Sequence, residues 1–212
     1  MSNDLLVEKS NGILKLIMNR PERRNAMSDE MLNDMLNELN KASFDNSIRV
    51  IVLTGAGNAF CAGGDVKDMA EKKDSGDKTT QQKTSDLRRV METARLLHEI
   101  TTPTIAVIPG PAAGAGFSLA MACDMRIACE SSKFTTAFAK VGFPGDFGGS
   151  YFLTQMIGTA KARELYYLSE LMTAQKAYKI GIINKVVADN EFEEEVKKII
   201  THIASGPSIA YR

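Results

Sequence analysis

One segment indicates how this chain folds: Thr104-Ile105-Ala106-Val107-Ile108-Pro109-Gly110-Pro111-Ala112-Ala113-Gly114-Ala115-Gly116. Its first five residues are an apolar run that is typical of a buried strand, and the small residues after it lead into a short apolar helix at 117–122. A strand that ends in this way leaves backbone N–H groups unpaired where the helix begins. The segment therefore predicts backbone donors that face a bound group.

A second segment has the same design. The apolar run Val50 to Thr54 predicts a strand, and after a turn it leads to Phe60-Cys61-Ala62-Gly63-Gly64-Asp65. Two such strand ends, brought together, could bind one oxygen atom through two N–H groups, as the stabilisation of an enolate or a tetrahedral oxyanion requires. A dinucleotide-binding fingerprint is excluded because Phe60 stands where its last glycine would be.

Strands and amphipathic helices alternate along the rest of the chain, which predicts an α/β fold. Ser28 is expected to cap a helix with an apolar stripe from Met31 to Leu39. The polar composition from Glu71 to Asp86 predicts a solvated loop, and a helix is expected at 87–99, before Pro103. Further strands are expected at 13–18 and 124–128, and further helices at 160–169, 174–180 and 193–203.

Composition narrows the class of protein. The 212 residues suffice for one domain, and 26 basic and 26 acidic side chains give a formal net charge of zero, so neither nucleic acid nor an anionic membrane is an expected partner. No apolar run is long enough to span a membrane and the N-terminus lacks a signal-peptide pattern, so a cytoplasmic location is expected. Cys61, Cys123 and Cys129 are expected to be small buried side chains, with no disulfide framework and no metal site.

A series of motifs resembles the crotonase, or enoyl-CoA hydratase/isomerase, superfamily over nearly the whole chain. They are Asn19-Arg20-Pro21-Glu22-Arg23-Arg24-Asn25-Ala26, the two glycine-rich segments with their strands, Phe143-Pro144-Gly145-Asp146-Phe147-Gly148-Gly149, and Gly181-Ile182-Ile183-Asn184-Lys185-Val186-Val187. The resemblance implies a crotonase-type spiral of repeated ββα units, assembled as a homotrimer or hexamer. It also implies a small-molecule acyl-CoA substrate and no separate cofactor, because coenzyme A is part of the substrate.

The same resemblance implies how the chain is divided. Residues 1–190 would form the spiral core, and residues 191–212 would be the start of a C-terminal helical region that is shortened relative to the family. The helix at 193–203 is then expected to be the last one.

The resemblance also implies site residues. The oxyanion-hole donors would be the N–H groups of Gly64 and Ala115, where alanine is acceptable because the peptide group donates. Arg23, Arg24 and Ala26 would line the nucleotide end of coenzyme A, and Ala62, Asp65 and Val66 would flank the pantetheine and the thioester. Without the resemblance, Arg23 and Arg24 are equally well interpreted as solvated surface charge.

The reaction depends on the carboxylates. Hydratases of the family carry two glutamates, and Ser118 and Phe138 stand at the matching positions, so the usual addition of water is not available. Asp146, two residues before Gly148, matches the acting aspartate of a subset that resembles epoxyphenylacetyl-CoA isomerase. Its pKa is expected to be raised by the apolar neighbours Phe143, Pro144 and Phe147.

A single carboxylate suffices to move a proton between two carbon atoms, so isomerisation of a double bond is the preferred reaction. A hydratase with a non-standard site stays open as an alternative. A hydrolase or dehalogenase with Asp146 as nucleophile needs a histidine where Met91 stands, and His98 lies two turns further along. A crotonase-fold protein that binds coenzyme A without catalysis is the remaining alternative.

Overall fold

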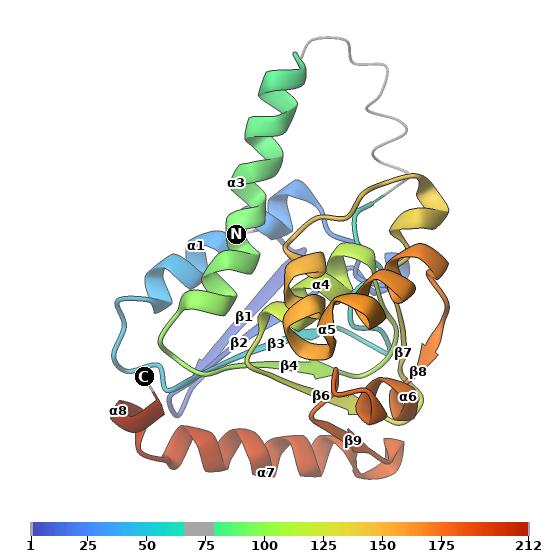
Figure 1. Ribbon diagram of the computed structural model, residues 1–212. Coiled ribbons are helices and arrows are strands. Elements are labelled where there is room, and N and C mark those ends of the chain that lie inside the picture. Colours follow the sequence, from blue (N-terminus) through green and yellow to red (C-terminus); the bar gives the residue numbers. More distant parts are fainter. Residues whose placement is uncertain (1, 66–78, 212) are drawn as a thin grey trace.

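A mostly parallel sheet forms the centre of the molecule (Figure 1). The computed structural model describes residues 2–65 and 79–211. Within these residues a six-stranded sheet has the order β1-β2-β3-β4-β6-β9, in which β1 is antiparallel to β2 and all other neighbours are parallel. Its strands are β1 (Leu5–Ser10), β2 (Ile13–Met18), β3 (Val50–Gly55), β4 (Thr104–Ile108), β6 (Met125–Cys129) and β9 (Lys185–Val187).

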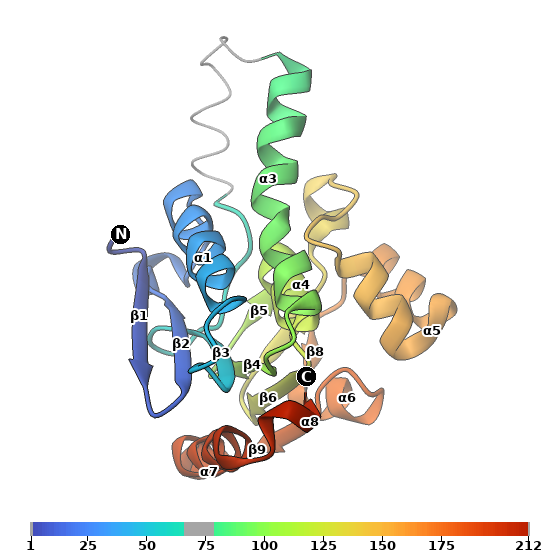
Figure 2. The same ribbon diagram turned by 90° about the vertical axis from the view of Figure 1, so that its left-hand side faces the viewer.

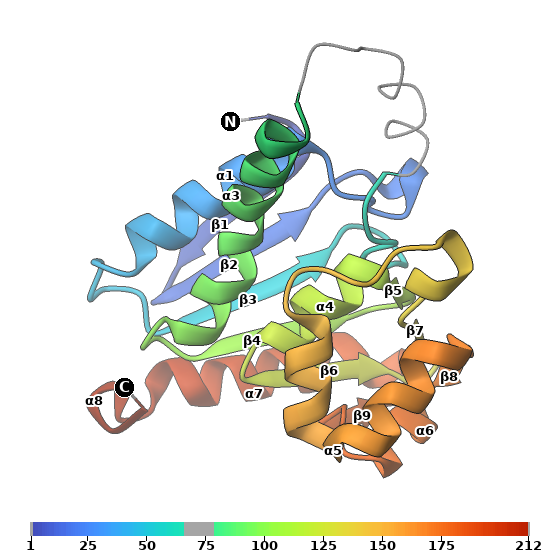
Figure 3. The ribbon, with the colours of Figure 1, turned by 45° about the horizontal axis from the view of Figure 1, so that its top comes forward.

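A small second sheet lies beyond the carboxyl ends of β4 and β6 (Figure 3). It joins β5 (Ala112–Ala113), β7 (Lys133–Thr135) and β8 (Met172–Thr173). Because β5 is part of the second glycine-rich segment, this sheet holds that segment at the end of the large one.

Helices cover both faces of the large sheet (Figure 2). The helices on one face are α1 (Asp29–Ala42), α3 (Thr80–Glu99) and α4 (Gly114–Ala122), and α7 (Phe192–Ser205) covers the other. Side chains of β3 alternate between the two cores, since Ile51 and Leu53 belong to the first and Val50 and Val52 to the second. The remaining helices are η1 (Pro21–Arg23), η3 (Phe138–Val141), α5 (Gly149–Leu168), α6 (Ala174–Lys179), η4 (Asp189–Glu191) and α8 (Ser208–Tyr211).

The cap of α1 is confirmed. Ser28 Oγ accepts a hydrogen bond from Met31 N at 3.1 Å and donates one to Asp4 Oδ2 at 2.5 Å, so it ties the start of the helix to the N-terminal segment. Replacement by Ala is expected to lower the free energy of unfolding by about 1 kcal/mol, because an N–H of the first turn loses its acceptor. Urea unfolding of Ser28→Ala and Ser28→Thr measures this, and the prediction is wrong if both variants match the native protein.

Two predicted helix starts and one prediction about helix order were wrong. The loop expected up to Asp86 ends earlier, because α3 begins at Thr80 and is capped reciprocally by Thr79 and Gln82. The helix expected at 160–169 begins at Gly149 and is kinked at Gly158 (φ 77°). The helix expected at 193–203 is not the last one, because α8 follows it.

The three cysteines are free and buried, as predicted. Among the helices of residues 2–65 and 79–211, none combines the length and the apolar character that a membrane crossing needs.

Candidate active site

The two glycine-rich segments are joined by backbone hydrogen bonds at the carboxyl ends of β3 and β4. Phe60 N and Cys61 N both donate to Pro111 O, at 3.0 and 3.2 Å, and Ala113 N donates to Cys61 O at 2.9 Å. The strand ends therefore meet, as the sequence indicates.

This junction brings Gly64 and Ala115 together. Ala115 lies in the first turn of α4, and a Cβ on Gly63 (φ +96°), the neighbour of Gly64, would lie 3.4 Å from Ala115 N. Neither the Gly64 nor the Ala115 N–H donates a hydrogen bond to any residue that the structure describes. Gly116 permits the close approach, because a Cβ there would lie 2.6 Å from Cys61 Sγ. Two neighbouring peptide groups are thus available to an external acceptor.

Asp146 lies in the turn that leads into α5. Burial raises the pKa of its carboxyl group to about 6. Its Oδ1 is buried and has no hydrogen-bond partner among the described residues. The predicted direction of the pKa shift is confirmed, but its predicted cause is wrong in part: Phe143 and Pro144 are exposed, and only Phe147 is buried.

Tyr166, which the sequence does not single out, covers this turn. The kink at Gly158 divides α5, and the second half of the helix brings the Tyr166 ring to 2.9 Å from the position of a Cβ on Gly145. Its Oη is buried without a hydrogen-bond partner in the described part of the chain. Burial and then the charge of Asp146 raise the pKa of Tyr166 to about 12. The Ser118 hydroxyl lies close enough to oppose this rise through a weak side-chain hydrogen bond, although the contact falls short of regular hydrogen-bond geometry.

Ser118 and Phe138 connect the turn to α4. A Cβ on Gly149 would lie 2.2 Å from Ser118 Oγ and 2.6 Å from Tyr166 Oη, so glycine leaves room there for two hydroxyl groups. The Phe138 ring lies near the position of a Cβ on Gly114, at 3.8 Å, and stacks on Tyr166 with a centroid distance of 6.0 Å. The two residues that stand in place of glutamates therefore lie beside the glycines on either side of Asp146, Phe138 beside Gly145 and Ser118 beside Gly149.

Among the residues expected to bind coenzyme A, two are paired with each other. The buried Asp65 contacts Arg23 Nη1 at 2.9 Å and Arg20 Nη2 at 3.0 Å. Arg23 is therefore held against the first glycine-rich segment rather than solvated alone. Arg24 is exposed, and its carbonyl accepts a hydrogen bond from Ala62 N at 3.0 Å.

The remaining members of this set differ in exposure. Ala62 is exposed beside Arg24, whereas Ala26 is buried and its carbonyl accepts a hydrogen bond from Arg20 Nη1 at 2.8 Å. Val66 lies outside the described residues. The structure thus places Ala62 and Arg24 side by side on the surface next to Gly64.

Neither Met91 nor His98 supplies the histidine that a dehalogenase of this family would need. Met91 on α3 is half-buried and packs against the main core. His98 is an exposed residue of the same helix, and its ring contacts Tyr151 and Phe152 at centroid distances of 6.1 and 5.0 Å.

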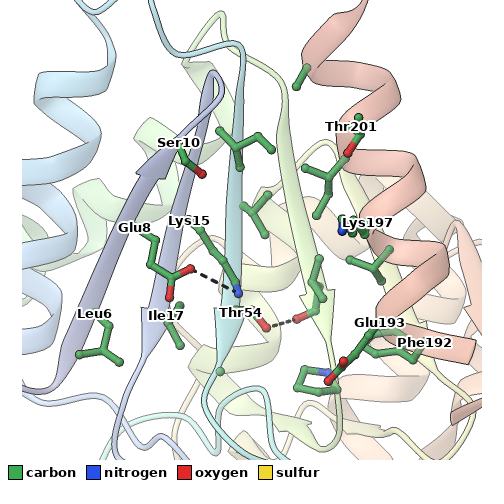
Figure 4. Close-up of a pocket in the computed structure, with 18 of the residues that line it drawn as sticks. Leu6, Glu8, Ser10, Lys15, Ile17, Thr54, Phe192, Glu193, Lys197 and Thr201 are labelled. Atoms are coloured by element: carbon green, nitrogen blue, oxygen red, sulfur yellow. Dashed lines mark hydrogen bonds and ion pairs between the residues drawn. The ribbon is translucent and has the colours of Figure 1, made fainter. Parts of the chain in front are cut away.

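A groove of about 1080 Å³ lies on the opposite side of the sheet, between its outer face and α7 (Figure 4). Its lining mixes charged and apolar side chains, such as the Glu8–Lys15 ion pair (3.7 Å) and Phe192. None of the site residues predicted from the sequence lines it. The groove is therefore separate from the junction of the glycine-rich segments.

The fold and the site together define an α/β protein in which two joined strand ends present N–H groups that no described residue accepts from, and in which a half-buried carboxyl group precedes α5. A sequence profile described as enoyl-CoA hydratase/isomerase matches residues 8–212. The chain belongs to the enoyl-CoA hydratase/isomerase family of enzymes and has the crotonase fold, as the sequence motifs predicted.

Relatives with curated descriptions include both reactions. The chain is 35% identical over 208 residues to the 1,2-epoxyphenylacetyl-CoA isomerase of Escherichia coli, covering 98% of this chain and 79% of the relative. It is 33% identical over 204 residues to a probable enoyl-CoA hydratase of Rhodobacter capsulatus, covering 96% and 76%.

Solved structures agree with this assignment. An enoyl-CoA hydratase from Mycobacterium avium subsp. paratuberculosis superimposes with a TM-score of 0.89 at 29% identity, covering 100% of this chain and 82% of that one. A Thermobifida fusca protein in complex with acetoacetyl-CoA superimposes with a TM-score of 0.90 at 25% identity, covering 99% and 83%.

Proposed function

We propose that this enzyme shifts a double bond in an enoyl-CoA or a related CoA thioester, with Asp146 moving the proton. The observation that carries the proposal is the state of Asp146: it is half-buried, its Oδ1 has no partner within the described residues, and burial raises its pKa to about 6. A carboxyl group with a pKa near neutrality both accepts and returns a proton readily.

The proposed reaction has two proton transfers. The Asp146 carboxylate removes a proton from the carbon beside the thioester, and the electron pair moves onto the thioester oxygen to give a dienolate. The N–H groups of Gly64 and Ala115 donate to that oxygen. The protonated Asp146 then delivers the proton two carbons further along, and the double bond comes to lie next to the thioester. No other group has to gain or lose a proton.

Coenzyme A would reach the site past Arg24 and Ala62, which are exposed beside the first glycine-rich segment. The Thermobifida fusca protein with bound acetoacetyl-CoA supports a CoA thioester as the ligand. The name of the Escherichia coli relative supports isomerisation.

A hydratase is the second candidate, because other relatives carry that name. Hydration needs one group to orient water and another to deliver a proton. Ser118 and Phe138 supply no second carboxylate, so the isomerase remains the proposal that the site supports better.

Incubation with a 3-enoyl-CoA in heavy water tests the proposal. The carboxyl proton of Asp146 exchanges with solvent between the two transfers, so we expect the 2-enoyl-CoA to carry deuterium at the carbon that receives the proton, and reversal of the first transfer to place deuterium beside the thioester of the substrate. We also expect kcat/KM to rise with pH to a plateau above about 6, because the free enzyme needs ionised Asp146. Mass spectrometry and a pH profile measure these results. A 3-hydroxyacyl-CoA as the main product would favour the hydratase, and binding of coenzyme A without turnover of any enoyl-CoA would favour the non-catalytic alternative.

A further inference from the structure

The Gly64 N–H belongs to a peptide group whose other end is hydrogen-bonded inside the protein. The carbonyl oxygen of that group is Gly63 O, which accepts a hydrogen bond from Met27 N at 2.8 Å. A peptide group is planar, and in its trans form the C=O and N–H bonds point in opposite directions. The bond from Met27 therefore sets the direction in which the Gly64 N–H points.

The same pattern is repeated one peptide group further back. The Met27 N–H shares its peptide group with the Ala26 carbonyl, and Ala26 O accepts a hydrogen bond from Arg20 Nη1 at 2.8 Å. Ala26, Met27 and Gly63 are all buried. Hydrogen bonds in such a chain polarise one another, and they are stronger where water is excluded. A guanidinium group is thus connected through two peptide groups to the proposed oxyanion donor.

The Arg20 side chain is held in place by the segment around it. It is only 12% exposed, its Nη2 contacts Asp65 Oδ2 at 3.0 Å, and its Nε lies 3.6 Å from Asp4 Oδ2. The Arg20 N–H donates to Asn25 Oδ1 at 3.0 Å, and the Arg20 carbonyl accepts from Asn25 N at 2.8 Å. Asn25 lies in the left-handed region (φ 56°), which asparagine tolerates. The chain therefore turns back and brings the Ala26 carbonyl to the guanidinium group.

The Ala115 N–H, the other proposed donor, is supported differently. Gly114 O, which shares a peptide group with this N–H, accepts a hydrogen bond from the neutral Ser118 Oγ at 3.3 Å. A hydrogen bond from a charged donor is shorter and stronger than one between neutral groups. We therefore expect Gly64 to be the stronger of the two donors.

We propose that Arg20 is a positioning residue for the oxyanion hole: through two peptide groups it orients and strengthens the Gly64 N–H donor. This inference rests on the proposed function in one respect, that the Gly64 N–H binds the thioester oxygen. Arg20 acts without touching the substrate, in contrast to Arg23 and Arg24, which are expected at the nucleotide end of coenzyme A.

The carbonyl stretching band of a bound thioester tests the inference, because hydrogen bonds to the oxygen lower its frequency. Butanoyl-CoA has no carbon–carbon double bond to move, and a heavy carbon isotope at its carbonyl identifies the band in infrared difference spectra. The native enzyme should lower the frequency relative to the free thioester, and Arg20→Gln should lose roughly 10–30% of that lowering. The Kd for butanoyl-CoA should stay within a few-fold of the native value. The kcat for a 3-enoyl-CoA should fall about tenfold, which is less than the loss of a whole donor causes.

Arg49→Gln is the matched control. Arg49 is also half-buried and also donates to backbone carbonyls, those of Ala204 and Gly206, but it lies at the amino end of β3, away from the glycine-rich segments. This variant should lose stability and keep the native band and the native kcat. An equal change of the band in Arg49→Gln and Arg20→Gln would show a general loss of packing and overturn the inference.

The outcomes separate this inference from the proposed function. A native band in Arg20→Gln overturns the inference, even where activity is lost. If circular dichroism shows that Arg20→Gln does not fold, Arg20→Lys carries the test: its single ammonium group lacks the fork that holds Ala26 O and Asp65 together, so part of the lowering should again be lost, and a native band overturns the inference. A band that depends on Arg20, in an enzyme that does not isomerise 3-enoyl-CoA, supports the inference and refutes the isomerase. A band at the frequency of the free thioester in the native enzyme overturns both.

Discussion

Replacement of Asp146 by Asn is expected to lower kcat for isomerisation of a 3-enoyl-CoA about 10²- to 10⁴-fold. The amide has nearly the shape of the carboxylate but cannot accept the proton. Exchange of deuterium into the carbon beside the thioester should fall to the same extent, because it depends on the same transfer. Affinity for coenzyme A should change little, since the proposed binding mode places the nucleotide near Arg24 and away from Asp146. Stopped assays with mass spectrometry measure both rates.

The stability of the same variant provides a control. The folded pKa of Asp146, about 6, lies above its ordinary value of 3.8, so the folded state binds more protons than the unfolded state in this window. The free energy of unfolding of the native protein therefore falls as the pH rises from about 4 to about 6. It stays at the lower value at higher pH. The asparagine in Asp146→Asn does not titrate, so the variant keeps its stability over this range. Its Tm should exceed that of the native protein at pH 7.5 but not at pH 4. An active variant, or one that is less stable at pH 7.5, would contradict the assignment.

Removal of the Ala115 N–H is expected to lower kcat about 10²- to 10³-fold. Proline has no N–H and is tolerated in the first turn of a helix, where Ala115 lies, so Ala115→Pro deletes the donor while α4 is retained. Loss of one oxyanion donor raises the barrier by about 3–4 kcal/mol. Kinetics with a 3-enoyl-CoA measure the effect, and circular dichroism verifies the fold.

Ala115→Gly is the matched control for this substitution. It keeps the N–H and removes only the methyl group, so kcat should stay within a few-fold of the native value. If the glycine variant lost as much activity as the proline variant, the side chain rather than the peptide group would be responsible. The role of the N–H would then be wrong.

The parts of this site that depend on local sequence pattern are predictable from the sequence. The strand ends before Gly64 and Gly114 follow from apolar runs next to small residues, and the structure joins them. Asp146 was found through its motif, and the direction of its pKa shift was correct. The groups that bury Asp146 were predicted wrongly, because Phe143 and Pro144 are exposed and Tyr166 comes from α5.

The features that were missed depend on distant contacts or on weak signals. Tyr166 meets the turn only because Gly158 bends α5, and nothing in the Tyr166-Tyr167 pair tells the buried ring from the exposed one. The first turns of α3 are exposed and have no apolar stripe, so composition predicted a loop. The spacing of Thr79 and Gln82 was a capping signal that marked the true start.

The hydrogen bonds between the two glycine-rich segments set the position of both N–H donors before any ligand arrives. Because Phe60, Cys61 and Ala113 are bonded directly across the junction, the donors cannot separate without breaking backbone bonds. In the proposed mechanism such a site is preorganised: its peptide dipoles are fixed before charge develops on the thioester oxygen, and little reorganisation energy is spent during the reaction. We therefore expect the amides of this junction to exchange with solvent slowly and at nearly equal rates, whether or not a thioester is bound.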